Sequence, residues 1–269
     1  MWEERVGAVA SRTSIGPVSA LVFDWRVGVW SLASSRVTKK VDSVSDLFLF
    51  ERDLADRGIS LVAGVDEAGR GPLAGPVVAA AVILPVEWLN AGLPQMLQGL
   101  TDSKQLTRSQ RNHFFRALHS LDGVQFGIAS VESFEVDQIN ILQATHRCMA
   151  TALARLSPGP QHTLVDGKFV PSIQLPQTPI VKGDARSYSI AAASVLAKVT
   201  RDRMMEDYHR QWPVYGFAEH KGYGTPEHLR ALDKYGPCPI HRRSFGPLRQ
   251  PELFGATQVN WRAGKSRQE

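Results

Sequence analysis

From residue 44 onward, short apolar runs alternate with longer segments in which apolar residues recur at helical spacing. The apolar runs are of strand length and predict strands over residues 61–66, 77–84, 124–131, 164–166 and 179–184. The helically spaced segments predict helices over residues 46–57, 107–120, 135–156, 190–212 and 226–235. Three early strands followed by alternating helices and strands indicate an α/β domain with a mixed sheet.

Turn and capping residues mark the ends of several of these elements. Gly58 follows the first predicted helix, and Thr107 stands at the N-cap position of the second. Thr225 precedes Pro226, and proline is a favoured first residue of a helix. The C-terminal side of the domain is therefore predicted to be helical.

Residues 1–43 follow neither pattern and are predicted to form an N-terminal extension. They mix Ser, Gly and Arg with three tryptophans, which is typical of an appendage that is poorly ordered or docked through a few aromatics; an overcalled start codon is the alternative. Glu3 and Glu4 stand where a secretory signal carries positive charge, which argues against such a signal. The predicted organisation is an extension over 1–43, a main domain over 44–248 and a tail over 249–269.

Composition excludes several function classes. The 269 residues include only two cysteines, which excludes a disulfide framework or a zinc cluster and fits a reducing cytoplasm. The longest uninterrupted apolar run, 77–84, is too short to cross a bilayer. Residues 1–40 hold six basic and three acidic residues, so they supply three of the five net positive charges. The main domain is close to neutral, so a nucleic-acid surface on it must arise from local charge patterning.

Four acidic residues stand where predicted strands end. Asp66 and Glu67 close the first apolar run, and Asp166 and Asp184 close two later runs, each beside a glycine. The ends of neighbouring strands lie side by side in an α/β fold, so acids distant in sequence can converge there. Crowded carboxylates repel one another and need a cation, and Mg²⁺ or Mn²⁺ prefers oxygen ligands. Two such ions roughly 4 Å apart can promote an in-line phosphoryl displacement.

The segment that follows Asp66 and Glu67 is a glycine-rich turn that contains Gly69, Arg70 and Gly71. Glycines let the backbone approach a ligand closely, and an arginine between them suits a phosphate. Acids and turn together indicate a metal-dependent enzyme that acts on a phosphate-bearing polymer.

Simpler explanations exist for single residues of this pattern. One Asp-Gly pair is usually a turn, so the metal hypothesis depends on the joint pattern. The histidines show no paired metal-ligand spacing, and His220, His228 and His241 are expected to be structural or solvent-facing. No Gly-x-Ser-x-Gly segment is present to support a serine nucleophile.

Several ordered segments resemble bacterial ribonuclease HII, and together they span about residues 45–248. The first is Gly-Val-Asp-Glu-Ala-Gly-Arg-Gly-Pro, and the full set occupies residues 64–72, 102–104, 165–167, 183–184, 189–202, 220–225 and 241–245. So many matches in the family's order argue against chance. The Gly-Arg-Gly triplet favours the HII type over the related HIII type.

The resemblance implies a ribonuclease H-like α/β fold, in which a mixed central sheet is flanked by helices and a helical C-terminal region follows. It implies that residues 44–248 are a catalytic domain that hydrolyses the RNA strand of RNA/DNA hybrids. It also implies a cut 5′ of single ribonucleotides embedded in duplex DNA, which leaves 3′-hydroxyl and 5′-phosphate ends. The implied setting is ribonucleotide removal in DNA repair and replication, by a cytoplasmic monomer that uses a two-ion site of Mn²⁺ or Mg²⁺.

The resemblance also assigns roles to individual residues. It implies that the catalytic and metal-binding set is Asp66, Glu67, Asp166 and Asp184. Gly69, Arg70 and Gly71 correspond to the segment that reads the ribose 2′-hydroxyl, the group that distinguishes RNA from DNA. Tyr223 corresponds to the tyrosine that stacks on the deoxyribose past the RNA–DNA junction, and Lys104 is expected to contact a backbone phosphate.

The tail contains a separate candidate motif. Gln250-Pro251-Glu252-Leu253-Phe254 resembles the Gln-x-x-Leu-Phe pentapeptides that dock bacterial proteins on the DNA sliding clamp. A short segment that presents Leu253 and Phe254 to an apolar pocket is a common recognition mode. The alternative is that both side chains fold back on the domain.

Two alternative functions share part of this pattern. Another ribonuclease H-like nuclease, such as a resolvase or an integrase core, would use the same acids but gives no reason for the Gly-Arg-Gly triplet. A non-catalytic RNA/DNA hybrid-binding module would be marked by loss of an acid, and all four acids are present.

Overall fold

The computed structural model describes residues 21–24, 29–32 and 46–249, and the chain divides into two units, residues 1–44 and 45–269. In the first unit, β1 (Leu21–Asp24) and β2 (Val29–Leu32) pair antiparallel, although the sequence pattern predicted no regular element there. The candidate clamp motif with Gln250, Leu253 and Phe254 lies outside the described residues.

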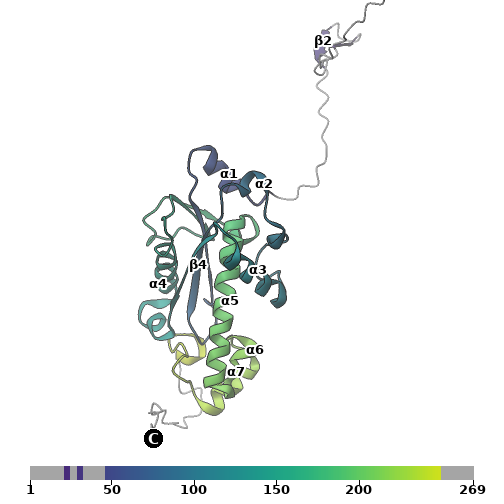
Figure 1. Cartoon of the computed structure of the whole chain (residues 1–269). Helices are drawn as coiled ribbons and strands as arrows, with labels where there is room; N and C mark the ends of the chain where they lie inside the picture. The colour runs from purple at the N-terminus through teal and green to yellow at the C-terminus, as the bar shows by residue number, and fades with distance from the viewer. Residues whose placement is uncertain (1–20, 25–28, 33–45, 250–269) are drawn as a thin grey trace, which may run out of the picture. The chain divides into compact units, whose positions relative to one another are not determined.

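A five-stranded mixed sheet forms the centre of the second unit (Figure 1). Its strands follow the order β5-β4-β3-β6-β7 and occupy Gln125–Val131, Val77–Ile83, Val62–Ala68, His162–Asp166 and Gln177–Ile180. Neighbours among β3, β4 and β5 are antiparallel, whereas β6 runs parallel to β3 and β7 runs parallel to β6. The mixed sheet predicted from the order of elements is confirmed.

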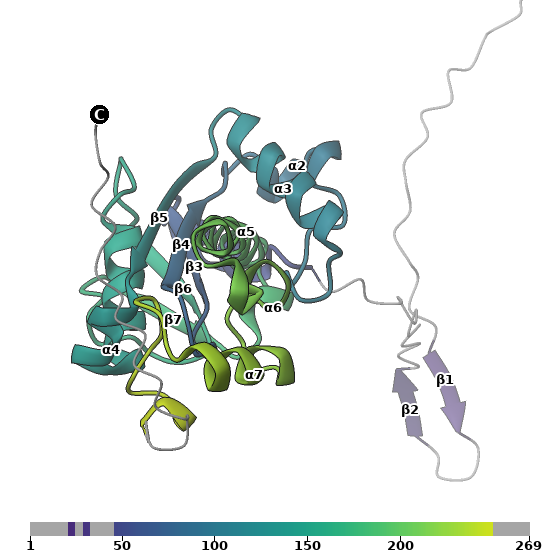
Figure 2. The same cartoon turned by 90° about the horizontal axis from the view of Figure 1, so that it is seen from below.

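Helices cover both faces of this sheet (Figure 2). α4 (Ser133–Leu153) packs on one face, and α5 (Tyr188–Gln211) packs on the other together with α3 (Arg108–Ser120). β4 consists entirely of buried apolar residues because it is covered on both sides. Successive side chains of a strand point to opposite faces, so they divide between two clusters, with Val78, Ala80 and Val82 toward α5 and Val77, Ala79, Ala81 and Ile83 toward α4.

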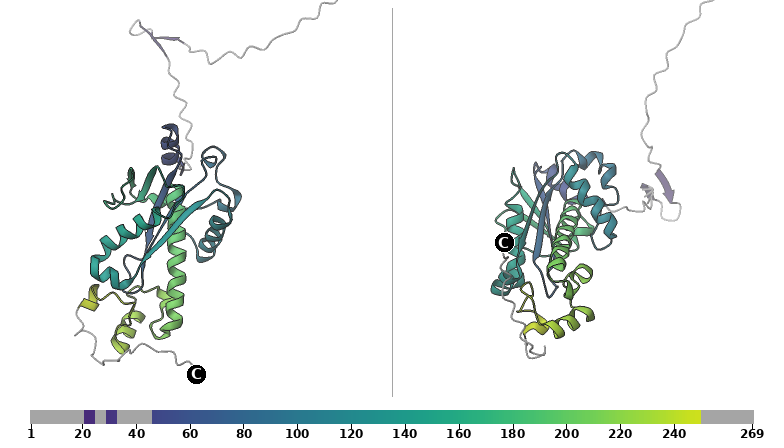
Figure 3. Two further views of the ribbon diagram at one scale, coloured as in Figure 1. Left: turned by 60° about the vertical axis from the view of Figure 1, so that its left-hand side comes forward. Right: turned by 60° about the horizontal axis from the view of Figure 1, so that its bottom comes forward.

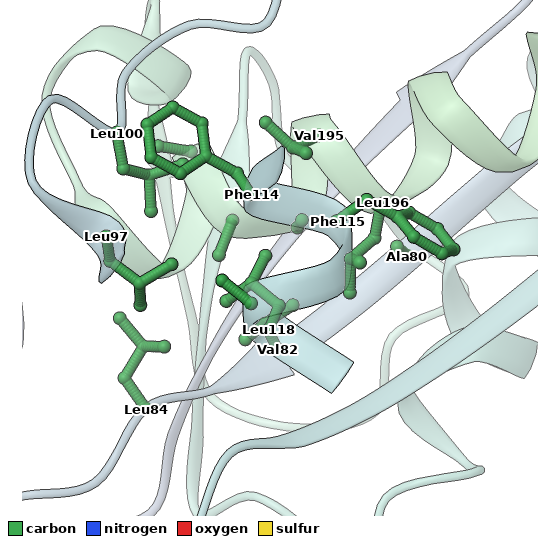
Figure 4. Packing of buried hydrophobic residues seen from close by; sticks show 14 of the residues in the cluster. Ala80, Val82, Leu84, Leu97, Leu100, Phe114, Phe115, Leu118, Val195 and Leu196 are labelled. Carbon is green, nitrogen blue, oxygen red and sulfur yellow. The ribbon is translucent and has the colours of Figure 1, made fainter. Parts of the chain in front are cut away.

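The apolar layer on the α5 face unites segments that are far apart in the sequence (Figure 4). Side chains from α3 and α5 close over β4 there, and the cluster includes Phe114, Phe115, Leu118, Val195, Leu196, Ala80 and Val82. Burial of this many apolar groups makes α5 a fixed platform along the sheet.

Shorter elements complete the second unit. α1 (Leu49–Asp56) and α2 (Trp88–Ala91) flank the early strands, and α6 (Phe217–His220) and α7 (Pro226–Tyr235) follow α5 (Figure 3). Among residues 46–249, 3₁₀ turns occupy Gln95–Leu97, Gly183–Ala185, Pro213–Tyr215 and Gly246–Arg249. The predicted helical C-terminal region is confirmed. Within the described part of the chain, no helix combines the length and the apolar composition that a membrane crossing requires.

Two predicted helix starts are confirmed in atomic detail. Thr107 accepts a hydrogen bond from the backbone N–H of Gln110, whose side chain in turn accepts from the N–H of Thr107. Thr225 accepts from the backbone N–H of His228, and Pro226 is the first residue of α7.

Two predicted strand ends were wrong. β3 continues to Ala68, so Asp66 and Glu67 lie inside the strand and pair with β4 instead of closing it. β7 ends at Ile180, and Asp184 lies in a 3₁₀ turn that begins after Lys182. Lys182 adopts a left-handed backbone conformation with φ of 55°, which turns the chain out of the sheet.

The predicted helix over 135–156 also differs from the structure. α4 begins two residues earlier, at Ser133, and ends at Leu153. Asn140 interrupts it with φ of 66°, and its side-chain oxygen accepts from the N–H groups of Leu142 and Gln143, which restarts the helix.

Candidate active site

Three carboxylates from three different segments meet beside β3. One oxygen each of Asp66, Asp166 and Asp184, here called the acid triad, lies within 4.8 Å of the others. Asp66 belongs to β3, Asp166 ends β6, and Asp184 lies in the 3₁₀ turn before α5. The structure thus brings together three of the four acids singled out in the sequence.

Strand pairing places the first two members of the triad next to each other. β3 and β6 are parallel neighbours with Val65 opposite Val165, so the following residues, Asp66 and Asp166, reach the same edge. A hydrogen bond of 2.7 Å from the backbone N–H of Gly183 to Oδ1 of Asp166 then ties the turn that carries Asp184 to the end of β6.

Close packing of α5 on β3 fixes the third member. A Cβ atom on Gly64 would overlap the backbone of Ser189 and Ile190, so glycine is required for this approach. A Cβ atom on Gly183 would lie 2.6 Å from Cδ1 of Ile190. The start of α5, and the turn immediately before it, can therefore lie directly against the strand that carries Asp66.

Glu67 lies outside the acid triad. It follows Asp66 directly in β3 and lines the same pocket as Asp66. Its Oε1 atom is 3.2 Å from Nη1 of Arg70, which donates a hydrogen bond to it. In this structure the carboxylate of Glu67 is therefore paired with the guanidinium of Arg70.

Burial raises the pKa values of three of these acids, and repulsion between the acids adds to the effect. Burial raises the pKa of Asp66 well above its usual value, and the charges of Glu67, Asp166 and Asp184 raise it further. Burial, with Asp166 adding to the effect, also raises the pKa of Asp184. The pKa of Glu67 is raised by burial although Arg70 opposes the shift. A divalent cation supplies the positive charge that such a group lacks, and the triad fits a metal site.

Lys104 supplies part of the missing charge. Its Nζ atom is 3.5 Å from Oδ2 of Asp184, although four-fifths of the Lys104 side chain is exposed. Burial lowers the pKa of Lys104, but the attraction of Asp184, Asp102 and Asp66 outweighs it, so the pKa is raised. An exposed ammonium at this place can exchange the carboxylate for a phosphate without a change of backbone.

A pocket of about 380 Å³ opens beside the triad, and Asp66 forms part of its wall. The other predicted substrate residues line it as well, namely Gly69, Arg70, Gly71, Tyr223 and Lys104. A Cβ atom on Gly71 would lie 3.6 Å from Cε1 of Tyr223, so loop and ring are direct neighbours. All five residues are thus brought together around one cavity.

Sequence reasoning missed several residues of this pocket. Ser103, Ser194, Lys198 and Arg201 line it, and Arg242 is buried directly behind the Gly69–Gly71 loop. The sequence held one signal for Arg201. It lies four residues after Ala197 and four before Met205, so it is a charged residue on the buried, otherwise apolar face of α5.

The histidines of the C-terminal region form a structural cluster. His228 and His241 are buried, and their Nε2 atoms lie 2.9 Å apart. The N–H of Cys238 donates to Nδ1 of His241, and Nδ1 of His228 contacts the carbonyl of Tyr223 at 2.9 Å. Because Nδ1 of His241 accepts, its Nε2 donates to His228, whose Nδ1 donates to Tyr223. Two neutral rings thus support the backbone of Tyr223.

A mixed sheet covered by helices on both faces, with a buried acid triad beside a pocket of glycine backbone and cations, defines a ribonuclease H-like α/β enzyme with an acidic metal site. The comparison with known families specifies the type. The chain belongs to the ribonuclease HII family, because the family model described as Ribonuclease HII matches residues 63–247.

Individual relatives agree with this assignment. The chain is 54% identical over 205 residues to the ribonuclease HII of Geobacillus thermodenitrificans (strain NG80-2), with 76% of each chain covered. It is equally similar to that of Geobacillus kaustophilus (strain HTA426), at 54% identity over 76% of this chain and 75% of the relative. The crystal structure of the ribonuclease H2 from Pyrococcus horikoshii OT3 is similar with a TM-score of 0.59 and 30% identity, over 71% of this chain and 97% of that one.

Proposed function

We propose that this chain is an endoribonuclease that hydrolyses the RNA strand of RNA/DNA hybrids and cuts 5′ of single ribonucleotides embedded in duplex DNA. The products would carry 3′-hydroxyl and 5′-phosphate ends, and the cellular role would be ribonucleotide removal in DNA repair and replication. One observation carries this proposal. Asp66 belongs both to the acid triad and to the wall of the pocket that contains the Gly69–Gly71 loop and Tyr223.

The metal site in this proposal is a two-ion site for Mg²⁺ or Mn²⁺. Asp66, Asp166 and Asp184 would hold the ions, and Glu67 would join them as fourth ligand on exchange of its bond to Arg70. The all-oxygen donor set and the raised pKa values of Asp66 and Asp184 support hard divalent cations. Bound ions of this kind activate a water and stabilise the leaving oxygen of a phosphodiester.

The pocket residues would select and place the substrate. Gly69 and Gly71 offer backbone donors without side chains of their own, which suits a ribose 2′-hydroxyl. Tyr223 is half-exposed and presents a flat ring beside Gly71, which suits a sugar that lacks the 2′-oxygen. The ammonium of Lys104 would hold a backbone phosphate next to the triad.

Cleavage of a labelled DNA duplex that contains one ribonucleotide tests the proposal. The protein is incubated with this duplex and with an all-DNA duplex of the same sequence, in Mg²⁺, Mn²⁺ or EDTA. We expect one metal-dependent cut immediately 5′ of the ribonucleotide and no cut in the all-DNA duplex. Absence of a cut with either metal, together with tight binding to the same duplex, would instead favour a hybrid-binding module.

The variant Asp66→Asn tests the role of the acid triad in the same assay. It removes one negative ligand but keeps the side-chain volume, so nearly all turnover should be lost while duplex binding persists. Substantial residual turnover would contradict the proposed metal role. Cleavage of all-DNA junctions by the unsubstituted protein would point to a resolvase-like nuclease instead.

We further propose that the tail docks on a DNA sliding clamp. The support is the segment Gln250-Pro251-Glu252-Leu253-Phe254 alone, which presents two large apolar side chains after an amide. The double variant Leu253→Ala with Phe254→Ala should lose clamp binding and keep nuclease activity. No measurable clamp binding by the unsubstituted protein would end this proposal.

A further inference from the structure

Two arginines of the described chain are buried at the pocket without carboxylate partners: Arg201 in the pocket wall and Arg242 behind the Gly69–Gly71 loop. Arg201 and Arg242 are 1% and 0% exposed. Within the described part of the chain, neither forms an ion pair. Fully buried arginines are rare unless they are paired, because loss of hydration is costly. Something other than a carboxylate must therefore compensate these two charges.

Backbone carbonyls of one loop compensate Arg242. Its Nη2 donates to the carbonyl of Gly69 at 2.7 Å, and its Nη1 donates to those of Arg70 at 3.1 Å and Pro72 at 2.9 Å. Its Nε donates to the carbonyl of Gly75 at 2.9 Å. One planar guanidinium thus binds four carbonyls, which its fixed fork of donors permits. The bonds enclose the whole turn between β3 and β4.

Arg201 closes the same turn from α5. Its Nε donates to the carbonyl of Pro76 at 2.9 Å, and its Nη2 contacts those of Ala74 and Lys221 at 3.1 Å each. A Cβ atom on Gly69 would overlap the Arg201 side chain, and Gly69 also has φ of +95°. Glycine is therefore needed at this position for the arginine as well as for the turn.

These bonds orient the other polar groups of the loop. Six carbonyls of the turn accept from the two guanidinium groups, namely those of Gly69, Arg70, Pro72, Ala74, Gly75 and Pro76. The backbone N–H groups of Gly69, Arg70 and Gly71 donate to no acceptor among the described residues, and the three residues line the pocket. A concave group of free N–H donors recognises anionic or hydroxyl oxygens, and it functions only while the backbone is held in one conformation.

We infer that Arg242, assisted by Arg201, is a positioning residue for ribonucleotide recognition: it holds the carbonyls of Gly69 and Arg70 inward, so that the N–H groups of the Gly69–Gly71 loop face the ribose 2′-hydroxyl. The inference rests on the proposed function, because it concerns the same pocket. It adds a determinant of specificity more than 170 residues away in the sequence. Arg242 touches no reacting atom and acts only through the loop.

The conservative variant Arg242→Lys tests this inference. Lysine keeps the charge and most of the stem, but its single ammonium cannot reach four carbonyls arranged around a plane. Binding is measured by fluorescence anisotropy in EDTA, so that no strand is cut. The two probes are a duplex with one ribonucleotide and an all-DNA duplex of the same sequence. The ratio of the two Kd values is the readout, because a loss of folded protein weakens both complexes equally.

The expected result is a selective loss. In Arg242→Lys, affinity for the ribonucleotide duplex should fall about ten-fold, the equivalent of one well-placed hydrogen bond. Affinity for the all-DNA duplex should change less than two-fold. The preference for the ribonucleotide duplex, measured as the ratio of the two Kd values, should therefore fall at least about five-fold. Arg201→Lys, which disturbs the other end of the same turn, should move the ratio in the same direction and carries the test if Arg242→Lys does not fold.

Two control variants separate positioning from general stability. Arg57→Lys makes the same chemical change at an exposed ion pair with Asp53, next to α1, and should leave both affinities unchanged. Leu118→Ala removes buried contacts between α3 and the sheet and should lower Tm without changing the ratio.

The outcomes are distinguishable. A preference for the ribonucleotide duplex that persists in folded Arg242→Lys, or that falls equally in Leu118→Ala, would overturn the inference and leave the proposed function intact. No preference in the unsubstituted protein would overturn the proposed function and this inference with it.

Discussion

Removal of one charge from the acid triad should stabilise the metal-free protein. In EDTA, Asp66 faces Asp166 and Asp184 with no divalent cation between them, and burial makes its charged form costly. The variant Asp66→Asn abolishes this repulsion without a change of volume. Its amide oxygen can still accept the 2.7 Å hydrogen bond from the N–H of Glu67. The same substitution that should remove turnover is therefore expected to raise stability.

The distances set the magnitude of this effect. At the 4.8 Å limit that separates the triad oxygens, two unit charges repel by about 3 kcal/mol at an effective dielectric constant of about 20. Proton uptake and water relieve part of this repulsion, so we expect a net gain of about 2 kcal/mol at pH 7. For a domain of this size, that gain corresponds to a rise in Tm of roughly 4–8 °C.

The gain should depend on pH with a defined sign. The native pKa of Asp66 lies above its unfolded value, so between these two values the native state binds more protons than the unfolded state. Stability of the unsubstituted protein therefore falls as pH rises through this window, and the advantage of Asp66→Asn grows and then levels off. Below the unfolded pKa, both proteins carry a neutral group and the advantage disappears.

Thermal unfolding in EDTA and in Mg²⁺ is the assay. Mg²⁺ should raise the Tm of the unsubstituted protein, because the bound ion relieves the same repulsion. The difference in Tm between the unsubstituted protein and Asp66→Asn should therefore be smaller in Mg²⁺ than in EDTA. Asp53→Asn is the matched control, since Asp53 is an exposed acid on α1 whose ion pair contributes little. A Tm of Asp66→Asn in EDTA at or below that of the unsubstituted protein would refute the reasoning.

Two further predictions concern the supporting structure. Burial lowers the pKa of His228 to about 4 and that of His241 to about 3, so the unfolded state takes up protons first as pH falls below about 6.5. Urea unfolding should therefore show that the free energy of unfolding falls as pH is lowered, by up to about 1.4 kcal/mol per pH unit for each ring. The variant His228→Gln should show a smaller dependence on pH. An unchanged dependence would exclude the two histidines as its origin. Gly64→Ala should cost about 3 kcal/mol or more and most activity, because its Cβ overlaps the backbone of α5. Gly159→Ala, with no atom within 4 Å of its Cβ, is the control, and equal Tm values for the two variants would contradict direct helix–strand contact.

Local pattern was sufficient for much of the fold. The apolar run at 77–84 corresponds to a strand buried on both faces, and the capping residues Thr107 and Thr225 begin helices where predicted. These features depend on neighbours within a few residues, so periodicity and side-chain chemistry reveal them. The same holds for the choice of Asp66, Asp166 and Asp184, because acids beside buried strands are conspicuous in any context.

Other features depended on contacts that no local pattern contains. The sequence did not reveal that the Glu67 carboxylate accepts a hydrogen bond from Arg70, three residues further along the loop. Asp184 was placed at a strand end, but the left-handed conformation of Lys182 puts it in a turn. Arg242 was not predicted as part of the site, because its hydrogen-bond partners are backbone carbonyls of a loop far away in the sequence.

The sequence by itself thus determined the kinds of element, their order and the chemical groups available for function. Each of these follows from side-chain chemistry and from periodicity over a few turns or strand repeats. Tertiary structure decided which of those groups meet. Parallel pairing of β3 with β6 and the approach of α5 over Gly64 assemble the triad, and two buried guanidinium groups set the direction of the loop beside it. Such contacts join residues a hundred or more positions apart, and only the folded backbone specifies their distance and direction.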